Sequence, residues 1–286
     1  MIIGCSNSVE LAKRIAKHSG QPFAELIVKH FPDGELYIRY PIDVKGKHIV
    51  LVQSMNPKPN DAMMEAMLAE RTAKELGAST VTLIAPYLAY LRQDKRFHPG
   101  ECKSNNIIAS MLKHFSRIIT IDPHLHRIRS LGEIFNTRTA TLSANELISD
   151  YIGKHWKNPA ILGPDIESFQ WAETIAAKLN LHALVLKKKR YTSRTVRIKL
   201  KEASGFKGKD VVIVDDIIST GHTMLEVVKQ LRKHGAKSVT CICVHGVFAE
   251  QAAEKLRKAG AKVISTNTIV HQTNAIDVSK IISEAL

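Results

Sequence analysis

The sequence predicts an α/β protein made of two similar halves, each a mostly parallel sheet flanked by helices. Short runs of wholly apolar residues alternate with stretches whose apolar residues recur at helical spacing, which is typical of buried parallel strands. One order of strand, helix and strand also occurs twice along the chain. The 286 residues suffice for two domains of ordinary size, and 44% of them are apolar, as in most globular proteins.

Two pairs of segments carry the repeat. Gly46–Ser54 (GKHIVLVQS) is similar to Gly208–Asp216 (GKDVVIVDD), and Glu75–Thr82 (ELGASTVT) is similar to Lys233–Thr240 (KHGAKSVT). Because βαβ units of unrelated proteins also look alike, the matches favour a duplication without proving one.

In the first half, the alternation predicts elements in a regular order. The expected strands lie near residues 1–5, 48–52, 80–85 and 117–121, and the expected helices near residues 8–17, 61–76 and 104–114. Two further strand-like runs, Leu26–His30 and Leu36–Tyr40, flank Phe31-Pro-Asp-Gly-Glu35, in which Gly34 can adopt a positive φ. This segment predicts a β-hairpin.

The second half is expected to open with a helix, because Ser143 and Glu146 have the spacing of a capping box. We therefore expect domains over residues 1–143 and 144–286. The other elements expected are strands at Ala160–Leu162, Ala183–Leu186 and from Val211, a helix from near Ser168, and a helix from Thr223 or Met224 whose apolar face is Met224, Val227, Val228 and Leu231.

Composition narrows the class of protein. The formal charge is +14, which anionic substrates or scattered surface lysines explain as well as nucleic acid does, and we find no nucleic-acid-binding motif. No apolar run approaches membrane-spanning length, and the first residues lack a signal peptide's basic start. The four cysteines are scattered, which predicts reduced thiols in a cytoplasmic protein. We expect neither a nucleic-acid nor a membrane partner.

The stretch VVIVDDIISTGHT, Val211–Thr223, carries the strongest chemical pattern. Its apolar strand ends in two carboxylates, and small hydroxyl and glycine residues then lead into a helix, where backbone N–H groups and the helix dipole attract phosphate. Carboxylates beside such a loop accept hydrogen bonds from sugar hydroxyls or hold Mg²⁺. The alternative is a helix cap preceded by two solvated acids. The pattern favours a ribose-phosphate site made of Asp215, Asp216, Ser219, Thr220, Gly221, His222 and Thr223.

This stretch resembles the phosphoribosyl-diphosphate (PRPP) loop of type I phosphoribosyltransferases and of ribose-phosphate diphosphokinases, also called PRPP synthetases. By itself it does not separate the two families. The resemblance implies that each half has the Rossmann-like type I phosphoribosyltransferase fold. Other motifs in family order favour the synthetases, and the chain is more similar to their shorter archaeal members.

The first of these motifs is Phe31–Glu35, which from its residues alone is best explained as a plain turn. It resembles the synthetases' ATP-binding loop, which reaches the nucleotide of a neighbouring subunit. The resemblance implies that Phe31 packs on adenine and that Asp33 and Glu35 accept hydrogen bonds from the adenine amino group or the ribose, with Gly34 in the same ATP-binding loop. It also implies that the protein is at least a dimer and that residues from about Asp277 onward fold back onto the first half.

Three shorter motifs are also similar to the synthetase pattern. The resemblance implies that Arg92 and Gln93 contact ATP, and that His124 and Asp165 lie beside Mg²⁺. From the residues alone, a solvated Arg-Gln-Asp segment and a helix-capping aspartate are equally reasonable. His126, two residues after His124, has no role that the family supplies.

The segment Lys187–Lys201 contains eight basic residues among fifteen and no acid. A solvated hairpin or an RNA-binding tongue would also explain it. It resembles the synthetases' flexible flap, and the resemblance makes Lys188 and Arg190 the catalytic cations, with Arg190 also reaching ribose 5-phosphate.

Taken together, the resemblance implies a magnesium-dependent ribose-phosphate diphosphokinase for nucleotide biosynthesis, with ATP and D-ribose 5-phosphate as substrates. A phosphoribosyltransferase would explain the PRPP loop but not the ATP motifs. A non-catalytic regulator would predict a damaged flap, whereas Lys188 and Arg190 are present. Ser219 and His222 depart from the aspartate and the glycine or alanine of many bacterial members.

Overall fold

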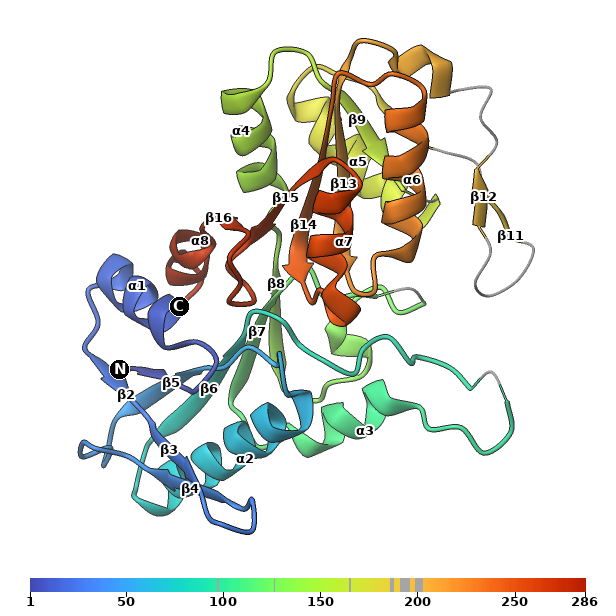
Figure 1. The fold of residues 1–286 in the computed structure, drawn as a ribbon. Coiled ribbons are helices and arrows are strands. Elements are labelled where there is room, and N and C mark those ends of the chain that lie inside the picture. The colour runs from blue at the N-terminus through green and yellow to red at the C-terminus, as the bar shows by residue number, and fades with distance from the viewer. Residues whose placement is uncertain (97, 126, 165, 186–187, 191–195, 199–202) are drawn as a thin grey trace. The chain divides into compact units, whose positions relative to one another are not determined.

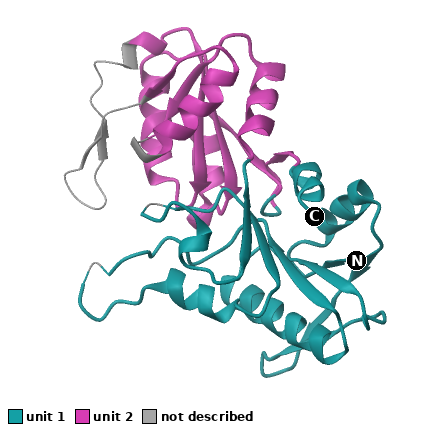
Figure 2. Cartoon of the chain, turned by 180° about the vertical axis from the view of Figure 1, so that it is seen from behind, with its two compact units in different colours: residues 1–143, 268–270, 278–286 teal, residues 144–267, 271–277 magenta. Residues whose placement is uncertain are grey.

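A computed structural model describes residues 1–286 except 97, 126, 165, 186–187, 191–195 and 199–202, with only the backbone described at 166–167, 185, 188–190, 196–198 and 203–204 (Figure 1). The chain divides into two compact units (Figure 2). Unit 1 comprises residues 1–143, 268–270 and 278–286, and unit 2 comprises residues 144–267 and 271–277.

Unit 1 is built on a six-stranded sheet in the order β2-β1-β5-β6-β7-β8, with every neighbouring pair parallel. Its strands are β1 (Ile2–Gly4), β2 (Phe23–Glu25), β5 (His48–Val52), β6 (Thr80–Ala85), β7 (Arg117–Ile121) and β8 (Arg138–Leu142). Its helices are α1 (Val9–Ser19), α2 (Pro59–Glu75), α3 (Ser104–Met111) and α8 (Ser279–Glu284), with a short 3₁₀ turn, η1, at Leu131–Glu133.

Successive side chains of a strand point to opposite faces of the sheet. An apolar strand therefore needs helices on both faces to bury its side chains. Ile49 and Leu51 of β5 are fully buried and belong to one apolar core with Ala62 and Ala66 of α2. In Figure 1, α2 and α3 lie on one face of the sheet and α1 lies on the other.

The end of the chain returns to unit 1. Helix α8 packs against α1, and the guanidinium Nη1 of Arg117 donates to the carbonyl of Ala285 at 2.8 Å. The simple division at residue 143 therefore needs a correction, because residues 268–270 and 278–286 belong to the first unit.

Unit 2 repeats the architecture with a sheet in the order β10-β9-β13-β14-β15-β16, again with parallel neighbours. Its strands are β9 (Ala160–Gly163), β10 (Ala183–Val185), β13 (Asp210–Ile218), β14 (Ser238–Gly246), β15 (Ala261–Thr266) and β16 (Asn274–Ile276). Its helices are α4 (Asn145–His155), α5 (Ile166–Lys178), α6 (His222–Lys233) and α7 (Ala252–Lys258), with 3₁₀ turns η2 (Ala203–Phe206) and η3 (Ala249–Gln251).

Each unit also carries a small antiparallel ribbon. In unit 1, β3 (Ile27–His30) pairs with β4 (Leu36–Arg39), which confirms the predicted hairpin around Phe31–Glu35. In unit 2, β11 (Lys188–Arg190) pairs with β12 (Val196–Ile198).

The predicted fold class is confirmed, because both units are parallel sheets with helices on their faces. The predicted apolar face of α6 is confirmed as well, since all four of its residues are buried. Among the described residues, no helix is long and apolar enough to cross a membrane.

Several predicted boundaries differ from the structure. Helix α4 begins at Asn145 after the N-cap Ala144, and Glu146 forms an ion pair with Lys178 of α5 in place of the expected capping box. Helix α5 begins at Ile166, ahead of the expected start near Ser168.

Candidate active site

The two carboxylates of the PRPP-loop motif lie on β13 close to its carboxyl end. Pairing of β13 with β9 ends at Ile213, whereas pairing with β14 continues to Ile218, so the strand runs past the point where we expected it to stop. Asp215 and Asp216 are half-buried, and each accepts a hydrogen bond from the amide of the next residue, at 3.1 Å and 2.8 Å. These bonds fix the direction of both carboxylates at the sheet edge where ligands bind in such folds.

Two cysteine thiols lie beneath this end of the strand. Burial raises the pKa of Cys241 and of Cys243, and the Asp215 carboxylate raises both further. The thiols are therefore neutral packing groups, and they take no part in acid-base chemistry.

The residues after β13 form a tight loop that begins α6. Gly221 has a φ of +69° and is the N-cap of a helix that begins at His222, one or two residues before the predicted start. All residues of α6 are described, and its first turn contains no acid. The loop therefore offers backbone donors and the positive end of a three-turn helix to an anion.

In unit 1, the hairpin loop that resembles an ATP-binding loop projects into solvent. The ring of Phe31 is 50% exposed and packs edge-on against Tyr37, with their centroids 6.0 Å apart. Gly34 has a φ of +95°, and Asp33 Oδ1 accepts from the amide of Glu35 at 3.1 Å. The loop is a closed turn that holds an aromatic ring outward.

The Arg-Gln segment lies between two buried anchors. Leu91 is 2% exposed, and the buried Asp94 accepts a 2.6 Å hydrogen bond from Arg127 Nη1, a pair that the sequence did not reveal. Arg92 is exposed and Gln93 is half-buried between these anchors. The described part of the segment between β6 and α3 lies apart from the β3–β4 hairpin in unit 1 (Figures 1 and 2). One copy of this unit therefore does not bring its two predicted ATP motifs together.

Of the two residues predicted to lie beside Mg²⁺, the structure describes His124 but not Asp165. Asp122 directly follows β7 in a buried position with a φ of +38°, and His124 is half-buried two residues later. Among the described residues, no group of three His, Cys, Asp or Glu side chains could hold a metal ion. Asp165 and His126 lie outside the described residues. For Lys188 and Arg190, the backbone forms β11 and the side chains are not described.

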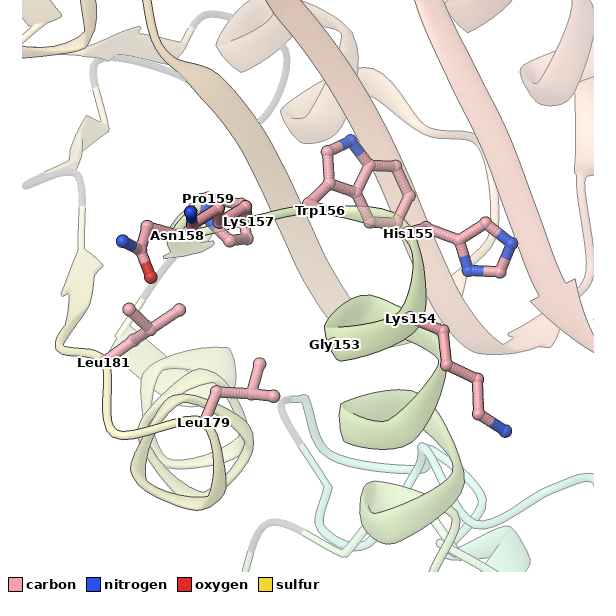
Figure 3. Close-up of a pocket in the computed structure, with 9 residues that line it drawn as sticks. All are labelled: Gly153, Lys154, His155, Trp156, Lys157, Asn158, Pro159, Leu179 and Leu181. Carbon is pink, nitrogen blue, oxygen red and sulfur yellow. The ribbon is translucent and has the colours of Figure 1, made fainter.

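A surface hollow of about 420 Å³ lies at the opposite edge of the unit 2 sheet, before β9 and β10 begin. The ends of α4 and α5 form it, and Figure 3 shows Lys154 and His155 turned away from its apolar residues Leu179 and Leu181. A ligand site needs polar groups that converge on its occupant, so this hollow does not compete with the β13 edge.

Comparison with known proteins decides the family. Residues 1–115 match the model described as the N-terminal domain of ribose phosphate pyrophosphokinase, and residues 130–279 match the phosphoribosyl transferase domain. The chain is 34% identical to the ribose-phosphate pyrophosphokinase of Methanothermobacter thermautotrophicus, covering 100% of this chain and 99% of that one. The chain belongs to the ribose-phosphate pyrophosphokinase family.

Two further members give the same result. The ribose-phosphate pyrophosphokinase of Methanosarcina acetivorans is 37% identical, over 100% of this chain and 98% of its own. The crystal structure of phosphoribosylpyrophosphate synthetase from Mycobacterium smegmatis matches with a TM-score of 0.85 at 28% identity, over 100% of this chain and 96% of that one. The predicted family is confirmed over both halves, including the first half that a phosphoribosyltransferase alone would leave unexplained.

This member of the ribose-phosphate pyrophosphokinase family also contains a buried acid that sequence analysis did not find. Glu65 of α2 accepts hydrogen bonds from the amide and hydroxyl of Ser6, at 2.8 Å and 2.5 Å, and so holds the loop after β1. Gln53 accepts from the amide of Asn7 in the same loop. Burial raises the pKa of Glu65, and the bonds from Ser6 oppose that rise. The available indication was a carboxylate among the alanines of the buried face of α2, which also contains the buried Glu70.

We expect the stability of Glu65→Gln to depend less on pH than that of the wild type. Because the folded-state pKa is above the ordinary value, the stability that neutral Glu65 contributes is complete below that ordinary value and is lost as pH rises through the folded-state pKa. Glutamine cannot ionise, so the variant's free energy of unfolding should fall less with rising pH. Urea unfolding at about pH 5 and about pH 8 measures this, with Glu75→Gln on the exposed end of α2 as control. Equal pH slopes in all three proteins would contradict the expectation.

Proposed function

We propose that the protein transfers the β,γ-diphosphoryl group of ATP to the anomeric hydroxyl of D-ribose 5-phosphate, giving PRPP and AMP. The anomeric oxygen forms a bond to the β-phosphorus, and the bond from that phosphorus to the α,β-bridging oxygen breaks. The bridging oxygen leaves on AMP, and the hydroxyl proton passes to water. Family membership over the whole chain is the observation that carries this proposal.

Ribose 5-phosphate would bind at the end of β13. Its phosphate would accept hydrogen bonds from the loop Ser219–Thr223 and the first turn of α6, where the helix dipole favours negative charge. Asp215 and Asp216 would accept hydrogen bonds from the ribose hydroxyls, since their half-buried carboxylates are already oriented by backbone amides. The loop thereby supports the acceptor sugar, whose anomeric carbon lies at the other end of the ring from its phosphate.

ATP would be held by Phe31, Asp33, Gly34 and Glu35 of one subunit and by Arg92 and Gln93 of its neighbour. An exposed ring can stack on adenine, and a guanidinium can donate two parallel hydrogen bonds to a phosphate. Lys188 and Arg190, on β11, would neutralise charge on the α- and β-phosphates in the transition state. This arrangement would align the two substrates for displacement in line with the leaving oxygen.

Mg²⁺ is the metal that fits this chemistry. It is usually bound by one or two carboxylates together with substrate phosphates and water, which agrees with the lack of a three-ligand cluster among the described residues. His124 and Asp165 would hold it. When bound, the ion would offset the negative charge of the ATP phosphates.

The deciding experiment is ³¹P NMR of the protein with Mg²⁺, ATP and ribose 5-phosphate. Resonances of AMP and of a sugar-linked diphosphate are expected to appear together as those of ATP decline. If the protein instead consumes added PRPP, and only when a nucleobase is present, it is a phosphoribosyltransferase. If the protein reacts neither with ATP and ribose 5-phosphate nor with PRPP and a nucleobase, both functions are excluded.

We further propose that the protein acts as a homo-oligomer, at least a dimer. The β3–β4 hairpin and the segment between β6 and α3 lie apart in unit 1, so a complete nucleotide site requires the hairpin of another copy.

We propose that the protein is located in the cytoplasm. All four cysteines, each of which the structure describes, are free thiols, which suits a reducing compartment.

Mixing two inactive variants tests the shared site. In a dimer of one Phe31→Ala subunit and one Lys188→Ala subunit, the Phe31→Ala subunit keeps its own Lys188 and receives an intact hairpin from its partner. Random mixing should therefore restore about a quarter of wild-type turnover in a dimer, although each variant alone is impaired. Turnover equal to the mean of the separate variants would show that the hairpin serves its own subunit.

A further inference from the structure

A strained turn follows β14 beside the phosphate loop of unit 2. Three residues other than glycine have positive φ within four positions: Phe248 at +45°, Glu250 at +54° and Gln251 at +60°. Left-handed backbone is unfavourable for a residue that carries a side chain, so three such residues persist only where packing holds them. Strain of this kind is concentrated at functional sites.

The packing that holds the turn is present on the Phe248 side. The ring of Phe248 is buried and lies against His271, with their centroids 4.6 Å apart. A side chain at Gly246 would meet the Phe248 ring at 2.3 Å, so only glycine leaves room for it. The ring therefore anchors the turn in the core of unit 2.

The strained turn also supports the phosphate loop that follows β13. The amide of Phe248 donates to the carbonyl of Ile218 at 2.9 Å, and Ala252 lies directly beneath Gly221, where an added Cβ would be 3.1 Å from that of Ala252. Gly221, which has a positive φ, therefore packs against Ala252, the first residue after the strained turn.

The same turn brings an acid to the histidine that opens α6. Glu250 Oε2 lies 3.7 Å from His222 Nε2, and Lys255 Nζ lies 3.5 Å from the same oxygen. Lys255 offsets the charge of Glu250, which would otherwise repel an anion on the loop. With the carboxylate at Nε2, the ring nitrogen left for a ligand on the loop is Nδ1.

We propose that Glu250 is a positioning residue, which orients the imidazole of His222 so that its Nδ1–H donates to the phosphate of ribose 5-phosphate. This inference rests on the proposed function for the identity of the ligand. At 3.7 Å the carboxylate attracts the ring without a direct hydrogen bond, which leaves the N–H of Nδ1 to donate to a phosphate. The positive φ of Glu250 places its carboxylate beside Nε2 of His222.

Glu250→Gly tests the proposal without adding strain, because glycine adopts positive φ readily. The dissociation constant and the KM of ribose 5-phosphate are expected to rise about three- to fivefold with kcat retained, the size expected for an exposed charge pair. Glu250→Gln, which keeps an acceptor oxygen, should recover part of the loss. Calorimetry with ribose 5-phosphate alone gives the dissociation constants independently of turnover.

The control variant is Gln251→Gly, which relieves the same kind of strain one residue away and should leave binding unchanged. A double-mutant cycle with His222→Ala tests whether Glu250 acts through His222. If it does, Glu250→Gly should have no further effect on binding once His222 is absent. An undiminished effect in that background, or no effect in the wild type, would overturn the proposal. If wild-type protein binds ribose 5-phosphate but forms no PRPP, the proposed function fails while this cycle still decides the role of Glu250.

Discussion

Lys188→Ala is expected to slow turnover about a hundred- to a thousandfold, which is the usual effect of removing one donor that stabilises transition-state charge. Its ammonium would meet the phosphates only as negative charge shifts onto the leaving AMP. The binding of ATP and of ribose 5-phosphate should therefore stay close to that of the wild type. AMP formation under single-turnover conditions measures the chemical step, and calorimetry measures binding.

Lys189→Ala is the matched control for this variant. It removes the same charge from the neighbouring position of β11, and successive positions of a strand face opposite sides. Net charge and flap composition change equally, so a difference in turnover would come from position alone. Equal loss in both variants would show that the flap acts through its overall charge, and unchanged turnover in Lys188→Ala would remove its catalytic role.

Asp216→Asn is expected to lower kcat/KM for ribose 5-phosphate about ten- to a hundredfold. The substitution keeps the shape of the side chain and removes the charge that strengthens hydrogen bonds from sugar hydroxyls, bonds worth about 1.5–3 kcal/mol each. ATP binding should change little if the residue serves the sugar. A fall in ATP affinity alone would reassign Asp216 to the nucleotide.

Asp210→Asn provides the comparison on the same strand. Asp210 lies at the other end of β13, where it accepts from Ser238 Oγ at 2.6 Å and pairs with Lys237 at 2.9 Å. The hydrogen bond from Ser238 and then that from Lys237 lower the pKa of Asp210. Its replacement should affect stability slightly and kcat/KM not at all, which separates the effect of the site from that of a lost carboxylate.

Most of the fold followed from local patterns. The strands β5, β6 and β7 match the predicted ranges, because a run such as Ile49–Val52 is wholly apolar and is stable only in a sheet that is covered on both faces. Helix starts were less accurate. Ser143 and Glu146 have the spacing of a capping box, yet α4 begins at Asn145 after the N-cap Ala144, and Glu146 pairs with Lys178 of α5.

By itself the sequence determined the alternation of strands and helices and the chemistry of Val211–Thr223, because both depend on residues that are contiguous along the chain. Tertiary structure alone decided the contact of Glu65 with Ser6 and the packing of Gly221 against Ala252. Each of these joins residues that are distant along the chain. The closure of such contacts is driven by burial of the whole core, and no local pattern records it.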